Sequence, residues 1–219
     1  MNPRFRRARW QDTVRRMKPP RPFSIAPAVV ATALLLLLQG NASAHSTAGN
    51  IGGFVSGFGH PLTGLDHIVA MVAVGLWGAY LRAPAMWLLP VVFPVVMAFG
   101  GALGVLHVPL PAVETCIALS GLLLGLAVAF AVRPPLWVAA AIVGFFAIFH
   151  GHAHGTELPN SANAMTYAIG FVIATGLLHL SGIALGLLLR WPWGHVVVRL
   201  SGAAIAVIGC LFLTGTIKA

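Results

Sequence analysis

The chain has 219 residues, of which 58% are hydrophobic and only 8% are charged. This composition excludes a soluble domain, because several uninterrupted apolar runs reach the roughly 20 residues that a helix needs to cross a bilayer. A net charge of +9 would favour a nucleic-acid partner, but eight of the 13 basic residues lie in the first 21 positions. Membrane lipid is therefore an expected partner, and nucleic acid is not.

The first 44 residues have the three parts of a secretory signal peptide. A basic segment is followed by an apolar core from Ile25 to Leu38 and by the small residues Ala42-Ser43-Ala44. We predict cleavage after Ala44, which leaves a single transmembrane domain over residues 45–219. The alternative is an uncleaved first membrane helix, and a start at Met17 would give a signal of ordinary length.

Proline, glycine and arginine residues divide the rest of the chain into about six apolar helices, which predicts an all-α, polytopic membrane helix bundle. The predicted helices are 65–82, 85–106, 112–132, 136–153, 164–189 and 197–216. Small residues spaced four apart would let helix backbones pack closely in lipid. These pairs are Gly100/Gly104, Gly121/Gly125 and Gly182/Gly186.

The orientation follows from two arguments that agree. Cleavage would place His45 on the periplasmic side, so the loop after the first helix and every second loop after it are cytoplasmic. These loops hold Arg82, Arg133, Arg190 and Arg199, whereas the outward loops and the C-terminus hold only Lys218. The positive-inside rule thus also predicts an inner-membrane protein with both mature termini in the periplasm.

In that orientation, nitrogen and oxygen ligands converge on the outer face. The mature chain has three carboxylates, Asp66, Glu114 and Glu157, and each maps to the outer end of a helix. Most of the histidines share this position. They are His45, His60, His67, His107, His150, His152 and His154.

The first candidate metal site is the sequence His60-Pro-Leu-Thr-Gly-Leu-Asp66-His67. Pro61 and Gly64 predict a turn before the helix, so that His60 folds back over Asp66 and His67. Asp66 has a plainer explanation as an N-terminal cap stabilised by the helix dipole. Ionisable residues in membrane spans are costly and usually functional, which favours a metal site of imidazole and carboxylate.

The second candidate site is the sequence Phe149-His-Gly-His-Ala-His-Gly-Thr-Glu157. In a helix, His150, His154 and Glu157 share one face, and His152 points almost oppositely. Such a stripe is a partial coordination sphere for a metal ion. Histidines that buffer protons at the surface or are satisfied within a loop are the alternative.

These two segments resemble the HupE/UreJ family of membrane proteins, which is associated with nickel hydrogenases and ureases. The family's two motifs match in full, within HPLTGLDHIVAMVAVG and as FHGHAHGTE. The resemblance covers essentially the whole predicted mature chain and implies a permease for nickel or cobalt. It also implies the functional positions His60, Asp66, His67, His150, His154 and Glu157. His152 falls at a variable position of the second motif and receives no role.

The implied ion is a transported substrate, and no permanently bound cofactor is expected. Nickel and cobalt accept imidazole with carboxylate, and the two cysteines, Cys116 and Cys210, lack the spacing of a thiolate site. Ligand type does not separate nickel from cobalt. The chain has no nucleotide-binding loop, so the source of energy for transport stays open. Whether the protein forms a homo-oligomer, and whether it is indirectly linked to the maturation of nickel enzymes, also stays open.

His179 is predicted near the middle of the fifth helix, either as a transfer ligand or as a neutral imidazole hydrogen-bonded to a neighbouring helix. Two other functions use the same ligands. One is a membrane metalloenzyme whose metal activates water, and the other is an accessory protein that binds metal without transport. A permease, not an enzyme, is favoured because the resemblance to the HupE/UreJ family implies transport and because an intramembrane histidine suits passage. Whether His45 or Glu114 helps to capture the metal stays open.

Overall fold

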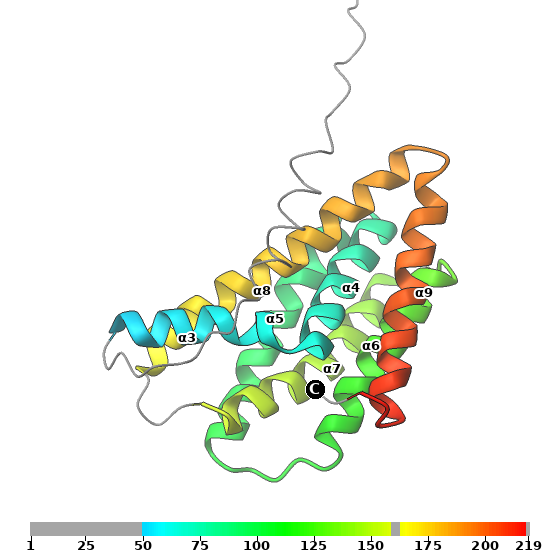
Figure 1. Ribbon diagram of the computed structural model, residues 1–219. Coiled ribbons are helices and arrows are strands. Elements are labelled where there is room, and N and C mark those ends of the chain that lie inside the picture. Colours follow the sequence, from blue (N-terminus) through cyan, green and yellow to red (C-terminus); the bar gives the residue numbers. More distant parts are fainter. Residues whose placement is uncertain (1–49, 159–162, 218–219) are drawn as a thin grey trace, which may run out of the picture.

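The structure, a computed structural model, describes residues 50–158 and 163–217 (Figure 1). The predicted signal peptide, its cleavage site and His45 lie outside the described residues. Within the described ranges there are seven α-helices, one 3-10 helix and no strand, which confirms the all-α fold. Their bounds are α3 Asn50–Thr63, α4 Leu65–Leu81, α5 Ala85–Val105, α6 Val113–Ala129, α7 Leu136–Thr156, α8 Ala164–Gly186, η1 Leu187–Arg190 and α9 Gly194–Leu213.

Helices α4 to α9 correspond to the six predicted membrane helices. The helix α6 ends at Ala129, three residues before its predicted end, because Ala131 has a φ of 58° and turns the chain towards α7. Four helices, α5, α7, α8 with η1, and α9, are each long and apolar enough to cross a membrane, and the bent pair α3–α4 makes a possible fifth span. The helix α6 is also apolar but has 17 residues. The chain is therefore a multi-pass membrane protein.

The turn predicted before the first membrane helix is only partly correct. Pro61 lies inside the last turn of α3, and the chain bends at Gly64, where the two helix axes differ by 81°. A proline so close to a helix end removes one backbone hydrogen bond without ending the helix. In Figure 1, α3 runs beside the first half of α8 and away from the other helices. Gly57 and Gly170 allow this contact, because a Cβ at either position would overlap backbone atoms of the other helix.

The predicted glycine pairs lie at helix contacts. At Gly100 and Gly104 of α5, an added Cβ would overlap backbone atoms of α7, and at Gly182 of α8 it would overlap the backbone of α4. Gly125 makes the same close approach to α9, whereas Gly121 approaches α9 more loosely. The bundle thus consists of backbone-to-backbone pairs, α5 with α7, α6 with α9 and α4 with α8, as small residues permit in lipid.

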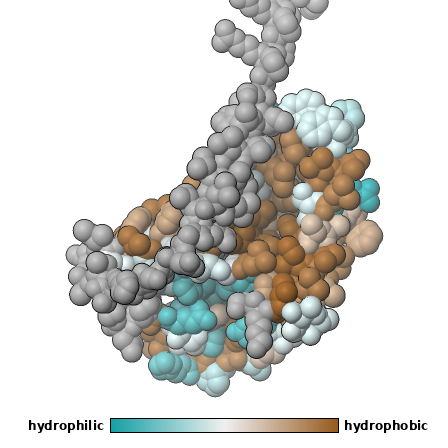
Figure 2. Space-filling model, in the orientation of Figure 1, coloured by the Kyte–Doolittle hydropathy of each residue, from teal (hydrophilic) through white to brown (hydrophobic). Residues whose placement is uncertain are grey.

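The two ends of the bundle differ in chemistry. At the end away from His60, the Arg133 guanidinium lies 4.8 Å from the ring centroid of Tyr80, and Nε–H of Arg199 donates to the carbonyl of Ala129 over 2.7 Å. Arg82 directly follows α4, and Arg190 is the last residue of η1, so both lie at this same end of the bundle. Figure 2 shows apolar side chains over much of the visible side of the bundle and hydrophilic residues gathered near its lower end. This end, where α7 finishes in Figure 1, holds the candidate site.

Candidate metal centre

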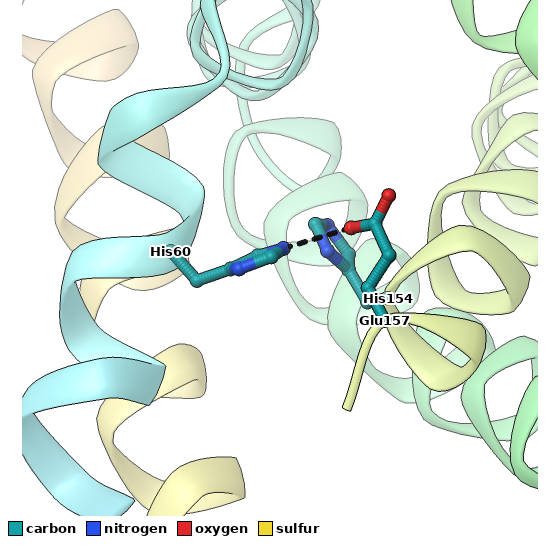
Figure 3. A group of neighbouring side chains, drawn as sticks. All are labelled: His60, His154 and Glu157. Atoms are coloured by element: carbon teal, nitrogen blue, oxygen red, sulfur yellow. Dashed lines mark hydrogen bonds and ion pairs between the residues drawn. The ribbon is translucent and has the colours of Figure 1, made fainter. Parts of the chain in front are cut away.

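His60 and Glu157 face each other from the ends of two helices (Figure 3). His60 lies in the last turn of α3, and Glu157 directly follows α7. Nε2–H of His60 donates to Oε2 of Glu157 over 3.2 Å, and their side chains are 28% and 56% exposed. His154 completes a group in which one ligand atom from each residue lies within 4.8 Å of the others. These three side chains can hold a cation at the polar end of the bundle.

Asp66 and His67 form a buried pair in the first turn of α4. Nδ1–H of His67 donates to Oδ1 of Asp66 over 2.8 Å. Asp66 does not act as the N-terminal cap that the plainer explanation required, because Gly64 occupies that position and no described side chain caps this helix end. A carboxylate on Nδ1 selects the tautomer in which Nε2 has no proton and can bind a metal, the arrangement common in second shells of metal sites.

The imidazoles of three helices meet at this end of the bundle. The ring centroid of His67 lies 4.3 Å from that of His154 and 5.1 Å from that of His150. The ring of His154 also lies 4.8 Å from that of His60. The predicted face of α7 is therefore turned towards α3 and α4. We call the whole set the outer cluster: His60, Asp66, His67, His150, His154 and Glu157.

Several nitrogens of the outer cluster are buried without a hydrogen-bond partner among the described residues. They are Nε2 of His67, Nε2 of His150 and both ring nitrogens of His154. Nδ1–H of His150 donates to the carbonyl of Phe146 over 3.0 Å, so its Nε2 is the acceptor nitrogen. Leaving a buried polar atom unsatisfied costs about 1–3 kcal/mol, and a bound cation would satisfy several of these atoms at once.

Comparison with known proteins identifies the family. Residues 33–212, most of the chain, match the family described as HupE / UreJ protein. The chain belongs to the HupE/UreJ family. It is similar to Protein HupE of Rhizobium leguminosarum bv. viciae, with 48% identity over 187 residues that cover 85% of this chain and 97% of that protein. No solved structure matches the chain. Membership in the HupE/UreJ family confirms the resemblance drawn from the two motifs.

Some histidines and carboxylates of this HupE/UreJ protein lie apart from the outer cluster. Nε2–H of His152 donates to the carbonyl of Val108, 2.8 Å away, which agrees with its predicted direction and gives it a structural role. Glu114 is exposed in the first turn of α6 and is not in the group of His60, His154 and Glu157. His107 is exposed in the connection after α5, and His195 is exposed in the first turn of α9.

Sequence reasoning missed the aromatic residues around the outer cluster. The ring centroid of Phe171 lies 4.4 Å from that of His154, and the ring of Tyr167 lies 6.1 Å from that of His60. Phe93 of α5 contacts His150 at a centroid distance of 5.4 Å. Aromatic residues in an apolar helix carry little signal of a site. The spacing of Tyr167 and Phe171, which places them on one face of α8, was the one available sign.

His179 is almost fully buried on α8, well along the helix from the outer cluster. Neither of its ring nitrogens has a hydrogen-bond partner among the described residues. The alternative prediction of an imidazole hydrogen-bonded to a neighbouring helix is therefore not realised in the described part of the chain. The ring of His179 contacts that of Phe93, at a centroid distance of 5.4 Å.

Proposed function

We propose that this protein is a permease that takes up a divalent transition-metal ion, nickel or cobalt, across the bacterial inner membrane. The observation that carries this proposal is a set of imidazole nitrogens, on His67, His150 and His154, that are buried beside the exposed carboxylate of Glu157 and have no hydrogen-bond partner within the described ranges. A cation would arrive at Glu157 and His60 and move to the buried nitrogens. The outer cluster is then the capture site, and His179 is a ligand further along the path.

The donors of the outer cluster suit the proposed cargo. Nickel and cobalt bind imidazole together with carboxylate, and the cluster supplies both kinds of ligand. Both cysteines lie on other helices, Cys116 on α6 and Cys210 on α9, so no thiolate competes for the ion there. The choice of nickel or cobalt over other divalent ions comes from the resemblance to the HupE/UreJ family, because imidazole and carboxylate alone also suit zinc.

The proposed direction of transport follows from the positions of the charges. Arg82, Arg133, Arg190 and Arg199 lie at the end opposite the outer cluster, and the positive-inside rule assigns that end to the cytoplasm. The outer cluster would then face the periplasm, as would both termini of the mature chain. An ion captured there moves inward.

The test is transport by the purified protein alone. Proteoliposomes with a metal-sensitive dye inside should accumulate Ni²⁺ or Co²⁺ faster than empty vesicles, and the variant His154→Ala should lose this uptake. The variant His195→Gln is a matched control, because His195 is an exposed histidine far from the outer cluster. Binding without uptake by the parent protein would instead support the accessory-protein alternative.

The metalloenzyme alternative predicts a different result in the same preparation. A catalytic metal would stay bound and would support hydrolysis of a substrate, because its open coordination position activates water. A transported ion exchanges across the membrane. Retention of one non-exchanging metal ion per chain after transport assays with labelled ions would overturn the permease proposal.

A further inference from the structure

One face of α8 carries several buried polar groups. The hydroxyls of Tyr167 and Thr175 and both ring nitrogens of His179 have no hydrogen-bond partner among the described residues. Tyr167, Phe171, Thr175 and His179 follow each other at intervals of four and therefore share one face of the helix. Thr175 and His179 are 0% and 1% exposed. This face continues from the outer cluster towards the arginine-rich end of the bundle.

A single aromatic ring connects the outer cluster to the deeper part of this face. Phe93 of α5 is fully buried, and its ring centroid lies 5.4 Å from His150 of the outer cluster and 5.4 Å from His179. Both contacts are edge-to-face. An ion that moves from the Nε2 atom of His150 to the imidazole of His179 would therefore travel beside a ring that contacts both imidazoles.

The backbone around His179 is held firmly, although its side chain has no polar partner among the residues that the structure describes. Gly75 of α4 packs directly against the His179 carbonyl, and Gly182 packs against the backbone of α4 one turn later. The position of the imidazole is thus set by helix packing. Its two unpartnered nitrogens, together with the Thr175 hydroxyl about one turn away, are available to a ligand.

We propose that Thr175 and His179 form an inner cation-binding station that the ion reaches from the outer cluster by displacing the ring of Phe93. This inference rests on the proposed function and specifies the path behind the capture site. The station has neutral ligands only, in contrast to the outer cluster with its carboxylates Asp66 and Glu157. Weaker binding at an inner station favours onward release, since a path conducts only when each site lets the ion leave.

The first test measures binding, independently of transport. Purified full-length protein in detergent is titrated with Co²⁺, and bound ions are counted by equilibrium dialysis and by the visible absorption of Co²⁺. The parent should bind one ion tightly and a second ion more weakly. The variants His179→Gln and Thr175→Val should lose the weaker ion and keep the affinity of the tighter one. The control Ser120→Ala removes a buried hydroxyl of α6 that donates within its own helix, and it should keep both ions.

The second test measures transport of the same proteins in vesicles. His179→Gln should lower Co²⁺ uptake by roughly tenfold or more, and Thr175→Val should lower it less, because a hydroxyl is the weaker ligand. The variant Phe93→Trp should slow uptake while both ions still bind, because the larger ring must move further to open the path. The control Phe145→Trp, on the exposed face of α7, should transport at the parental rate.

The outcomes separate the inner station from the permease proposal. If the parent protein does not transport, the permease proposal fails, and the count of two bound ions still decides whether the inner station exists. A parent that binds a single ion, or a His179→Gln protein that keeps two ions and the parental uptake rate, would overturn the inner station alone.

Discussion

The Nδ1 atom of His67 lies 2.8 Å from a carboxylate oxygen of Asp66, and Nε2 of the same ring is buried without a partner in the part of the chain that the structure describes. The pair is local in sequence, yet it faces two histidines of α7 that come more than eighty residues later, His150 and His154. Asp66 thus orients a nitrogen towards imidazoles that only the folded bundle brings together.

Replacing the carboxylate of this pair should weaken metal binding without unfolding the protein. Asp66→Asn keeps the shape and an acceptor oxygen for Nδ1–H, but it removes the negative charge that makes the imidazole a better ligand. We expect about 10–100-fold weaker binding of Ni²⁺, measured by calorimetric titration in detergent. Glu114→Gln is the control, because Glu114 is exposed on α6, and it should bind Ni²⁺ as the parent does. Equal affinity of Asp66→Asn and the parent would remove Asp66 from the site.

Alanine substitution of two neighbouring histidines of α7 should affect different properties, metal affinity at His154 and stability at His152. His154→Ala should abolish tight Ni²⁺ binding, because His154 contacts both His60 and His67. His152→Ala should bind Ni²⁺ nearly as the parent does but unfold at a lower temperature, because it loses the hydrogen bond to Val108. Thermal unfolding and calorimetric titration of the two variants test this. An equal loss of affinity in both would contradict the assignment of one ligand face to α7.

The candidate ligands stood out in the sequence because their chemistry is rare in an apolar chain. A carboxylate or imidazole in a span stands out, and the helical spacing of His150 and His154 correctly placed them on one face. The contacts between segments were not predictable in the same way. That His67 lies against His154, and that Phe93 contacts both His150 and His179, depends on how α4, α5, α7 and α8 pack, which no local pattern reports.

Helices α4 to α9 were predicted from their apolar runs, whereas α3 was not predicted, and this difference has a physical reason. The helix α3 contains Pro61 and four glycines, and these residues are typical of loops when no neighbour is considered. In the bundle, two of these glycines, Gly53 and Gly57, permit close contact with α8, so that tertiary packing stabilises a helix with weak intrinsic propensity.

A matched pair of glycine substitutions should show that close packing positions His179. Gly75→Ala places a methyl group against the His179 carbonyl, so we expect a loss of about 1–3 kcal/mol and a lower unfolding temperature in detergent. Gly176→Ala, on α8, meets nothing within 4 Å and should be neutral or stabilising, since alanine favours helix by about 1 kcal/mol. Equal unfolding temperatures for the two variants would show that α4 and α8 do not pack with Gly75 directly against the His179 carbonyl.

The proposed orientation can be tested with reporter fusions. Fusions at Arg133 and Arg190 should report the cytoplasm, and fusions near Asn160 and after Ala219 should report the periplasm, because the arginines gather at one end of the bundle. Paired alkaline phosphatase and green fluorescent protein reporters provide opposite signals at each position. A cytoplasmic signal from the C-terminal fusion would invert the orientation and place the outer cluster on the inner side of the membrane.

The bend between α3 and α4 allows a test of the Asp66–His67 pair that leaves every ligand in place. A Cβ added at Gly64 would lie 2.8 Å from Oδ1 of Asp66 and 3.0 Å from Nδ1 of His67, so that the pair must shift. The backbone of Gly64, at φ −89° and ψ 114°, suits alanine, and the substitution should therefore not destabilise the fold through strain.

We accordingly expect Gly64→Ala to bind Ni²⁺ roughly tenfold more weakly while its unfolding temperature stays close to that of the parent. Gly59→Ala is the control on the adjacent helix, because a Cβ there meets nothing within 4 Å, and its affinity should be unchanged. The comparison separates orientation of a ligand from its presence, since both variants retain all six side chains of the outer cluster. Parental affinity in Gly64→Ala would show that the tight Asp66–His67 contact is not required for binding.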